Sequence, residues 1–212
     1  MGVKERKERD KVEMRDKILQ SAQHLFLARG FDQISIRNIA EAIEYSPATI
    51  YLYFKDKNEI VHALHQDGFR LLVRHFEPLV KFTDPFERLI EMGNAYIKFA
   101  TTNPGVYELL FVRTEPMEYV SNCLDEEWKE GDRAFEVLFQ TVSQCQQSGH
   151  FKGLDTQNLS MMIWSFIHGL CSLGISNHIA HVKEARDKKL VVDAVMASTY
   201  QTFQTVMERL KA

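Results

Sequence analysis

The chain has 212 residues, 45% of them hydrophobic, and a formal net charge of −3, which is enough for one or two domains with a sizeable core. Its three cysteines, Cys123, Cys145 and Cys171, are odd in number and widely spaced, which argues against a disulfide scaffold and suits a reducing cytoplasm. No stretch approaches the ~20 apolar residues of a membrane helix, and the charged N-terminus is not a signal peptide, so neither a membrane protein nor a secreted one is expected.

Residues 1–14 are expected to form a charged N-terminal extension. The run from Lys4 to Lys17 mixes basic and acidic residues that nearly cancel, and it lacks an apolar core. Such a run is more often a solvated, frayed extension of a helix than a flexible arm that reaches a partner. Both interpretations stay open at this point.

Residues 15–62 are predicted to form a three-helix domain, whose first helix is apolar on one side between Ile18 and Phe26. Ser35 can cap a second helix that begins at Ile36, because its hydroxyl accepts a hydrogen bond from the free amides of the first turn. Apolar residues then recur at i, i+3, i+4 and i+7, as on one face of a helix. They are Ile36, Ile39, Ala40 and Ile43.

Ser46 and Pro47 are a second start signal, because the hydroxyl caps and proline suits the first helical position, where its missing N–H has no partner anyway. Ile50 and Phe54 then share an inward face at i, i+4. Two short helices joined by a tight turn, over about residues 35–54, have the layout of a helix-turn-helix that reads DNA.

Asp56 and Glu59 have the spacing of a capping box that opens the next helix. Lys57 would lie in the first turn of that helix. Backbone amides and a cation that face the same point make a phosphate site, so we expect Lys57 to contact a phosphate.

Residues from about Arg15 to Leu64 resemble the DNA-binding domain of the tetracycline-repressor (TetR) family. The resemblance is carried by Ile18-Leu19-Gln20-Ser21-Ala22, Leu25-Phe26, Gly30-Phe31, Ile39-Ala40 and the run from Ala48 to Ile60. Glu44 departs from the family, which usually has glycine here because glycine tolerates positive φ. We expect Glu44 either to take a mildly strained left-handed conformation or to rearrange the turn.

The resemblance implies contacts with double-stranded operator DNA. The DNA-binding positions are Arg37, Pro47, Ala48 and Tyr51 for base edges, Thr49, Tyr53 and Lys57 for phosphates, and Ser46 beside them. Pro47 and Ala48 have no side-chain donors, so they can offer only apolar contact, for example to a thymine methyl. Arg37 is therefore the expected hydrogen-bonding base reader, with a solvated surface arginine as the alternative.

The distribution of charge agrees weakly with this assignment. Residues 1–57 hold 11 Lys and Arg against 9 Asp and Glu, whereas residues 58–212 hold 15 against 20. The positive excess therefore lies in the part expected to meet DNA, and residues 4–17 are the candidate arm that would reach it.

Residues 63–212 are predicted to form a C-terminal helical domain, to which the resemblance assigns effector binding and dimerisation. The expected helices cover 57–79, begin at 85 and at 104, run from after Pro116 to near Gly149, and cover 156–176 and 187–211. No segment alternates with period two between turns. The chain is therefore expected to be all-α, with about nine helices.

The last two expected helices look like a dimer interface, because one carries a stripe of small residues and the other a heptad seam. The predicted interface residues are Ser165, Gly169 and Ser172, followed by Val192, Met196, Thr199, Phe203, Val206 and Leu210. Two such helices from each subunit would form a four-helix bundle about a two-fold axis. The alternative is that the seam packs only within its own subunit.

The run from Trp164 to Leu170 resembles the Trp-…-His-Gly signature of one TetR C-terminal subfamily, in which this half binds a small effector and pairs subunits. An aromatic, amphipathic set makes an effector site plausible. Its members are Tyr96, Phe99, Tyr107, Phe111, Trp128, Phe135, Trp164 and His168. For His168 the alternative is a satisfied core histidine, and Glu108, Arg113 and Glu126 would either orient the effector or lie on the surface.

The resemblance implies a bacterial, cytoplasmic, ligand-responsive repressor that binds a palindromic operator as a homodimer. A small apolar or amphipathic effector would release it by population shift. The alternative, favoured by the acidic net charge, is a helical small-molecule-binding protein or small enzyme without DNA function. The pairs His62/His65 and His178/His181 supply too few ligands for a zinc site. The sequence has no phosphate-binding glycine loop and no nucleophile elbow. We therefore expect no enzyme activity, metal, cofactor or membrane partner.

Overall fold

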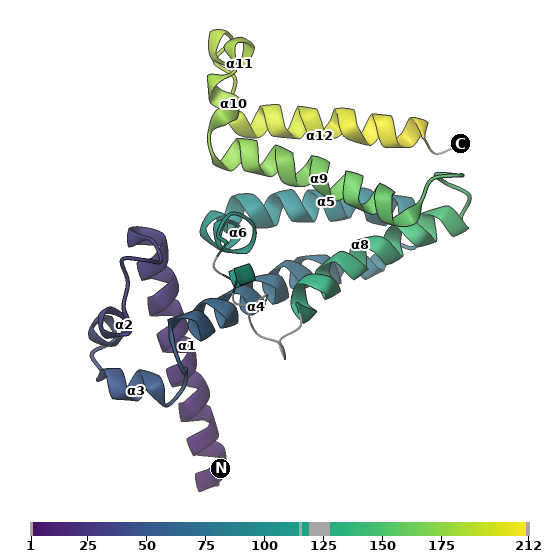
Figure 1. Ribbon diagram of the computed structural model, residues 1–212. Helices are drawn as coiled ribbons and strands as arrows, with labels where there is room; N and C mark the ends of the chain where they lie inside the picture. Colours follow the sequence, from purple (N-terminus) through teal and green to yellow (C-terminus); the bar gives the residue numbers. More distant parts are fainter. Residues whose placement is uncertain (1, 115, 119–127, 211–212) are drawn as a thin grey trace. The chain divides into compact units, whose positions relative to one another are not determined.

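The computed structural model describes residues 2–114, 116–118 and 128–210. The chain divides into two compact units, one made of residues 1–68 and 108–128 and the other of residues 69–107 and 129–212. They are called the N-terminal and the C-terminal unit below. Two helices, α4 (Lys57–Phe76) and α6 (Pro104–Phe111), contribute residues to both units, and Figure 1 labels the elements in chain order.

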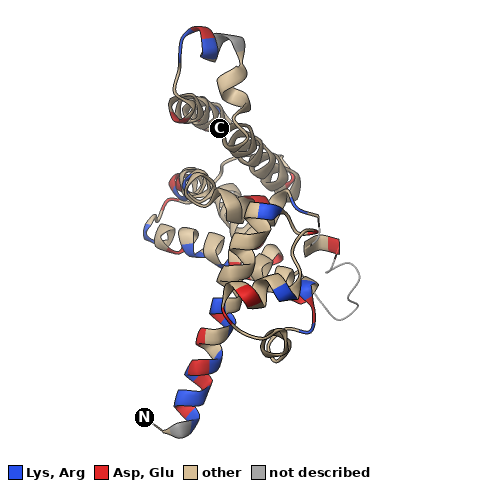
Figure 2. Ribbon diagram, turned by 90° about the vertical axis from the view of Figure 1, so that its left-hand side faces the viewer, with Lys and Arg blue, Asp and Glu red and all other residues tan. Residues whose placement is uncertain are grey.

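Helix α1 (Val3–Arg29) begins well before the apolar run that starts at Ile18. The carboxylate of Glu5 accepts a hydrogen bond from the backbone N–H of Gly2 at 2.8 Å, and Arg9 pairs with Glu13 at 3.4 Å. Local pairs of this kind stabilise exposed turns. The charged run is thus a helical extension and not an irregular arm, and Figure 2 shows its positive and negative residues interspersed along this end of α1.

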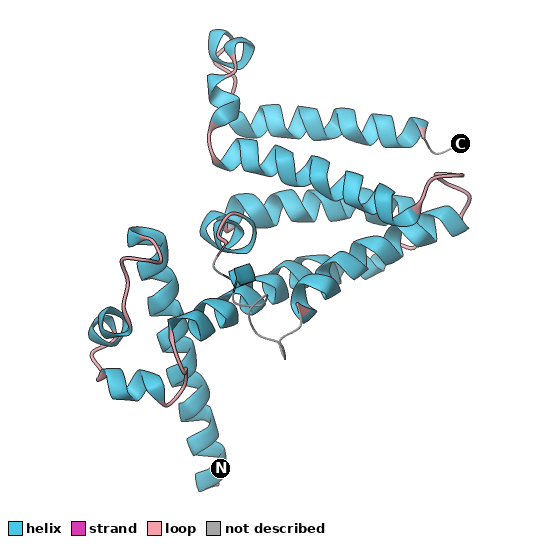
Figure 3. Cartoon of the chain, in the orientation of Figure 1, coloured by secondary structure: helices cyan, strands magenta, loops and turns pink. Residues whose placement is uncertain are grey.

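Within the described residues every regular element is helical and no strand occurs (Figure 3), which confirms the all-α prediction. These residues form eleven α-helices and one 3-10 helix. The α-helices beyond the expected nine are the short α10 (His178–His181) and α11 (Lys183–Asp187).

The helix-turn-helix consists of α2 (Ile36–Ala42) and α3 (Pro47–Tyr51). Ser35 Oγ accepts a hydrogen bond from the backbone N–H of Asn38 at 3.3 Å, which confirms the predicted cap of α2. Ser46 Oγ accepts one from the N–H of Thr49 at 3.2 Å, which confirms the cap of α3. Each hydroxyl satisfies one of the amides that a first helical turn leaves free.

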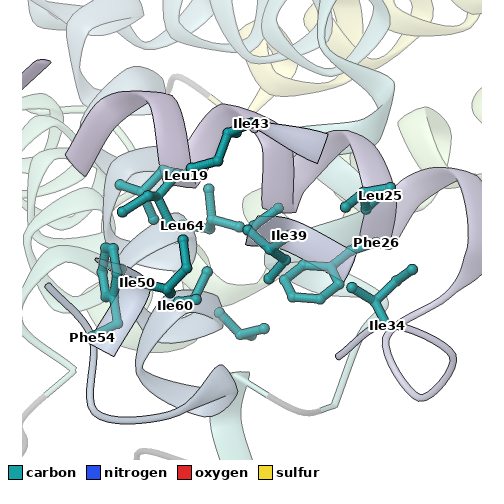
Figure 4. Packing of buried hydrophobic residues seen from close by; sticks show 14 of the residues in the cluster. Leu19, Leu25, Phe26, Ile34, Ile39, Ile43, Ile50, Phe54, Ile60 and Leu64 are labelled. Carbon is teal, nitrogen blue, oxygen red and sulfur yellow. The ribbon is translucent and has the colours of Figure 1, made fainter. Parts of the chain in front are cut away.

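Isoleucines from both short helices fill the core of the N-terminal unit (Figure 4). Ile39 and Ile50 are 0% exposed, as are Ile18 and Ala22 of α1 and Ile60 of α4. Helices of seven and five residues are too short to persist alone in water. Burial against α1 and α4 therefore holds the helix-turn-helix in shape.

The turn after α2 has Glu44 in the left-handed region, with φ 62°, as one of the two sequence alternatives predicted. The Glu44 N–H donates to the Glu41 carbonyl at 3.1 Å, and the Tyr45 N–H donates to the Ala40 carbonyl at 2.9 Å. This pair of bonds is the Schellman motif, which ordinarily places glycine at the left-handed position. Glu44 thus keeps the geometry of the turn at a steric cost.

Replacing Glu44 with glycine should stabilise the protein, because glycine takes this conformation without the ~1–2 kcal/mol that a side chain costs there. We expect Glu44→Gly to raise the free energy of unfolding in urea by about 0.5–1 kcal/mol, after allowance for the greater freedom of glycine in the unfolded chain. Glu44→Ala is the matched control and should not be stabilised. Equal stabilities for the two variants would contradict the strain at Glu44.

Helix α4 begins as the sequence predicts, with one difference of detail. Asp56 Oδ1 accepts a hydrogen bond from the Glu59 N–H at 2.9 Å. The Glu59 carboxylate returns to the backbone N–H of Lys55 rather than to that of Asp56. The second hydrogen bond of the capping box therefore goes to the residue before the expected one, and both bonds still satisfy backbone N–H groups at the start of α4.

The C-terminal unit is built on α5 (Pro85–Thr102), which packs against α8 (Lys129–Gln147) and α9 (Thr156–Ile175). Helix α12 (Val192–Arg209) packs against α9, and the 3-10 helix η1 (Glu77–Lys81) against α5. Helices α5 and α9 begin at their predicted aspartate caps, Asp84 and Asp155, which accept hydrogen bonds from first-turn amides.

Two predicted helix boundaries in this unit are wrong. The helix expected to run from after Pro116 to near Gly149 is not continuous: residues 116–118 are helical, Trp128 is not, and α8 begins at Lys129. The last helix begins at Val192 rather than near Asp187. Between α11 and α12 the chain turns through Lys189, at φ 52°, and this left-handed residue ends one helix before the next can start.

Helix α9 corrects the expectation that no segment has the length and composition of a membrane span. Among the described residues it alone passes that test, with 33% of its apolar window buried. It contains no Lys, Arg, Asp or Glu. Because α9 packs against α5, α8 and α12 of its own unit, its apolar character is that of a core helix of the C-terminal unit.

Candidate DNA-binding and effector sites

The outward side of the helix-turn-helix carries the side chains that the core does not bury. Arg37 on α2 and Ala48 on α3 are exposed, and the Tyr51 side chain is 57% exposed. Ala48 and Tyr51 share a face at i, i+3. Pro47 is half-buried at the start of the same helix. The four predicted base-reading residues therefore all lie on these two short helices.

The side chains predicted to contact phosphates also make contacts within the N-terminal unit. Ser46 is exposed and Thr49 is half-buried, and their hydroxyls lie 3.0 Å apart in the cap of α3. Tyr53 is half-buried against the core. Hydroxyl groups can both donate and accept, so these side chains keep a donor for a phosphate oxygen while they hold the start of α3.

Two lysines of the N-terminal unit hold its loops. Lys57 Nζ donates to the Phe31 carbonyl at 2.9 Å and lies 3.8 Å from the centroid of the Phe31 ring. Lys17 Nζ donates to the Ile43 carbonyl at 3.2 Å and lies 4.9 Å from the Tyr45 ring centroid. Both ammonium groups are thus held by a carbonyl and an aromatic face, a role that the sequence did not indicate.

Three helices of the C-terminal unit bring four aromatic polar side chains together. The Tyr107 hydroxyl of α6 lies 2.8 Å from His168 Nδ1 and donates to the His168 carbonyl at 3.0 Å. The Tyr96 hydroxyl of α5 lies 3.1 Å from the same Nδ1 and accepts a hydrogen bond from Trp164 Nε1 at 3.5 Å. We call Tyr96, Tyr107, Trp164 and His168 the aromatic cluster.

The aromatic cluster is electrically neutral near pH 7. Burial lowers the pKa of His168, which favours the uncharged imidazole. Burial also raises the pKa values of Tyr96 and Tyr107, so both phenols keep their protons. Neutral hydrogen-bonding groups set among aromatic rings suit a ligand that is largely apolar with a polar end.

Phe99 and Phe135 join the aromatic cluster, with ring centroids 6.4 Å from Tyr96 and 6.1 Å from Trp164 respectively. The other two predicted effector residues, Phe111 and Trp128, belong to the N-terminal unit, so the predicted set is divided. Glu108 and Arg113 form an ion pair at 2.7 Å, and Glu126 lies outside the described residues.

The sequence did not single out Tyr200, which shapes a second feature of this unit. A groove of about 460 Å³ between α5 and α12 is lined by Tyr200 together with Asn94 and Gln204. The Tyr200 hydroxyl donates to the Ile90 carbonyl at 2.6 Å. Its ring occupies the space that a side chain at Gly93 would need, and this close approach explains the glycine in the middle of α5.

The predicted dimer residues fall into two groups. Met196 is 3% exposed and packs beside Gly174, and the Phe203 ring stacks on Phe166 at a centroid distance of 4.2 Å. These two seam residues thus pack within their own subunit, as the alternative interpretation held. Several others remain available at the surface of α9 and α12: Ser165 is exposed, Val206 is 48% exposed and Leu210 is 43% exposed.

The histidine pairs have separate environments. His62 and His65 are buried on α4, and burial together with the neighbouring His62 lowers the pKa of His65 to about 4. His178 is exposed and its Nδ1 lies 2.6 Å from Ser176 Oγ.

The cysteines that the structure describes are buried. Cys145 and Cys171 are both 0% exposed, and burial raises the pKa of the Cys171 thiol to about 12. A protonated thiol is a poor nucleophile. Cys123 lies outside the described residues.

Removing the Tyr107 hydroxyl should destabilise the C-terminal unit, because it is in contact with both the ring and the carbonyl of His168. We expect Tyr107→Phe to lower the free energy of unfolding by about 1–3 kcal/mol, the usual cost of leaving a buried polar group unsatisfied. The matched control is Tyr45→Phe, at a side chain that is 44% exposed, with an expected change below ~0.5 kcal/mol. Equal stability of Tyr107→Phe and the wild type would show that the cluster contributes nothing to folding.

Two family models match the chain. One, described as "Bacterial regulatory proteins, tetR family", covers residues 18–64. The other, described as "Tetracyclin repressor-like, C-terminal domain", covers residues 89–198, about half of the chain. The first covers the helix-turn-helix and the second covers most of the helices that carry the aromatic cluster.

Individual transcriptional regulators are also similar to this chain, over a smaller share of its length. The transcriptional regulator TcmR of Streptomyces glaucescens is 37% identical over 59 residues, which are 28% of this chain and 25% of that protein. The curated relatives matched first are covered over 25% to 64% of their own length.

Solved structures share the fold over nearly the whole chain. The fatty acid degradation regulator FadR of Bacillus halodurans has a TM-score of 0.69 at 19% identity, over 88% of this chain and 92% of that one. FadR of Bacillus subtilis, solved in complex with stearoyl-CoA, has a TM-score of 0.65 at 20% identity, over 87% of this chain and 95% of that one.

Proposed function

This chain belongs to the tetR family of bacterial regulatory proteins, and on that premise we propose that it is a transcriptional regulator whose affinity for operator DNA responds to a small molecule. The observation that carries the proposal is the helix-turn-helix itself. Its two short helices bury Ile39 and Ile50 completely and leave Arg37 and Tyr51 at the surface. Such a division suits a pair of helices that reads the major groove.

Base recognition would then fall mainly to Arg37 and Tyr51. Arginine can bond two acceptors on guanine, whereas Pro47 and Ala48 can offer only apolar contact to a thymine methyl. Ser46, Thr49, Tyr53 and Lys57 would contact phosphates. Few hydrogen bonds per subunit would reach the bases, so specificity would also rest on half-site spacing and DNA shape.

A homodimer would supply that spacing. Helix α9 carries no charge, and it exposes Met162 and Leu173, each at 50%, beside Ser165. An uncharged surface with apolar and small residues on two adjacent helices is suited to close packing against a second copy. We infer that Ser165, Gly169 and Ser172 of α9, with Val192, Thr199, Val206 and Leu210 of α12, form the interface.

The aromatic cluster is the proposed effector site. The proposed effector is a largely apolar molecule with one polar end. We also propose that the chain belongs to the Trp-…-His-Gly subfamily, which the run from Trp164 to Gly169 resembles. Binding would favour a conformation with lower operator affinity. Repression relieved by the effector, without catalysis and in the cytoplasm, is the proposed mode of action.

The DNA proposal is tested by the affinity of the protein for its own upstream region. Arg37→Ala should weaken binding by 10- to 100-fold or more, because a bidentate hydrogen bond to a base is worth ~1–3 kcal/mol. Fluorescence anisotropy at fixed salt measures this effect. Arg186→Ala, at an exposed arginine in the C-terminal unit, is the control and should bind like the wild type. Wild-type protein that binds no upstream fragment would favour a helical small-molecule-binding protein or small enzyme.

The dimer proposal is tested by placing a charge on α9. Ser165→Glu should raise the dimer dissociation constant at least ~100-fold, because two like charges would be buried about the two-fold axis. Sedimentation velocity at micromolar concentration measures the species. Ser148→Glu, at an exposed serine after α8, should leave the dimer intact. A wild-type protein that sediments as a monomer would refute the interface.

A further inference from the structure

The helix-turn-helix is short of free positive charge for a surface that meets DNA. Residues 31–57 contain three basic residues against four acidic ones. They are Arg37, Lys55 and Lys57 against Asp32, Glu41, Glu44 and Asp56. Lys57 is half-buried and donates one hydrogen bond to the Phe31 carbonyl, so Arg37 and Lys55 are the exposed cations of this segment. Phosphate contacts ordinarily supply much of the affinity for DNA, so other cations of the N-terminal unit are needed.

Helix α1 has cations on one side of its extension. Lys4, Lys7, Lys11 and Arg15 follow one another at spacings of three, four and four residues, which places them on a single face of a helix. The lysines are exposed and Arg15 is half-buried. We call these four residues the basic stripe.

The basic stripe continues the face by which α1 packs on the helix-turn-helix. The next steps of the same spacing reach Ile18 and Ala22, which are both 0% exposed in the core. Arg15 lies at the junction, with its guanidinium 5.4 Å from the ring centroid of Phe54, just after α3. The stripe therefore leaves the core on the side of α3, and Figure 1 shows α1 extending past α3 towards the N-terminus.

The acidic residues of the extension occupy other positions around the helix. Glu5 is bonded to the Gly2 N–H and Glu13 is paired with Arg9. Asp16 lies away from the stripe, whereas Glu8, four residues after Lys4, and Asp10, three residues after Lys7, flank it. The run that looks neutral in sequence thus contains four cations that follow one helical face, with acidic residues on either side of that face.

We propose that the basic stripe binds the sugar-phosphate backbone of the DNA that flanks the base pairs read by α3. The proposal rests on the proposed regulatory function and adds a second DNA-binding region to it. From Arg15 to Lys4 the helix rises by about 16 Å, at ~1.5 Å per residue, which spans about five base pairs at ~3.4 Å each. The partner is DNA because the stripe begins at Arg15, which contacts Phe54 just after α3, and belongs to the same unit as the helix-turn-helix.

The test compares two variants with the same change of charge. Lys7→Gln/Lys11→Gln removes two cations of the stripe, and Arg6→Gln/Arg9→Gln removes two cations from other faces of the same extension. Binding to the upstream DNA is measured by anisotropy as a function of salt. The stripe variant should lower the slope of log affinity against log salt by ~0.9 for each phosphate that is no longer neutralised, and by up to ~3.6 for four such phosphates in a dimer. The control should keep the wild-type slope.

Trimming the DNA locates the stripe on the operator. Removing five flanking base pairs from each end should weaken the wild type and the control variant at least tenfold at low salt, and should leave the stripe variant unchanged. Far-UV circular dichroism should show equal helix content in both variants. Equal reductions of affinity in the two variants would overturn the proposal. A stripe variant that binds DNA as tightly as the wild type, in an assay in which Arg37→Ala binds more weakly, would also overturn it. A wild type that binds no DNA would overturn the regulatory function as well.

Discussion

Burial of Ile39 and Ile50 is the constraint on which the N-terminal unit depends. Each lies on a helix too short to hold its own hydrogen bonds in water, and each is 0% exposed. The seven- and five-residue helices therefore exist because α1 and α4 supply apolar surface for them. The polar residues left at the outside are positioned by this core, and their geometry is only as good as the packing behind them.

The same helix α1 serves two environments in succession along one face. Ile18 and Ala22 lie in the core, and towards the N-terminus the same face carries the four cations of the basic stripe. Meanwhile Lys17 and Lys57, which a count of charges assigns to DNA, hold loop carbonyls. Some of the cations of the N-terminal unit thus stabilise loops, and others lie on the exposed extension of α1. Net charge alone hides this division.

Features set by near neighbours in sequence were predictable, and those set by distant residues were not. The serine caps and the left-handed Glu44 follow from residues a few positions apart. The hydrogen bonds between Tyr107 and His168 join residues 61 apart, and periodicity carries no information about them. A heptad pattern likewise cannot tell packing within a subunit from packing between subunits, and Met196, which the pattern assigns to an interface, is buried beside Gly174 of the same chain.

The hydrogen bond from Trp164 to Tyr96 gives the C-terminal unit an optical property. The chain contains two tryptophans, and one of them has its indole N–H directed at the tyrosine that also contacts His168. Indole emission depends on the polarity and hydrogen bonding around the ring. Any molecule that enters the aromatic cluster must alter those surroundings, so intrinsic fluorescence reports occupancy without an added label, and effectors can be sought before the operator is known.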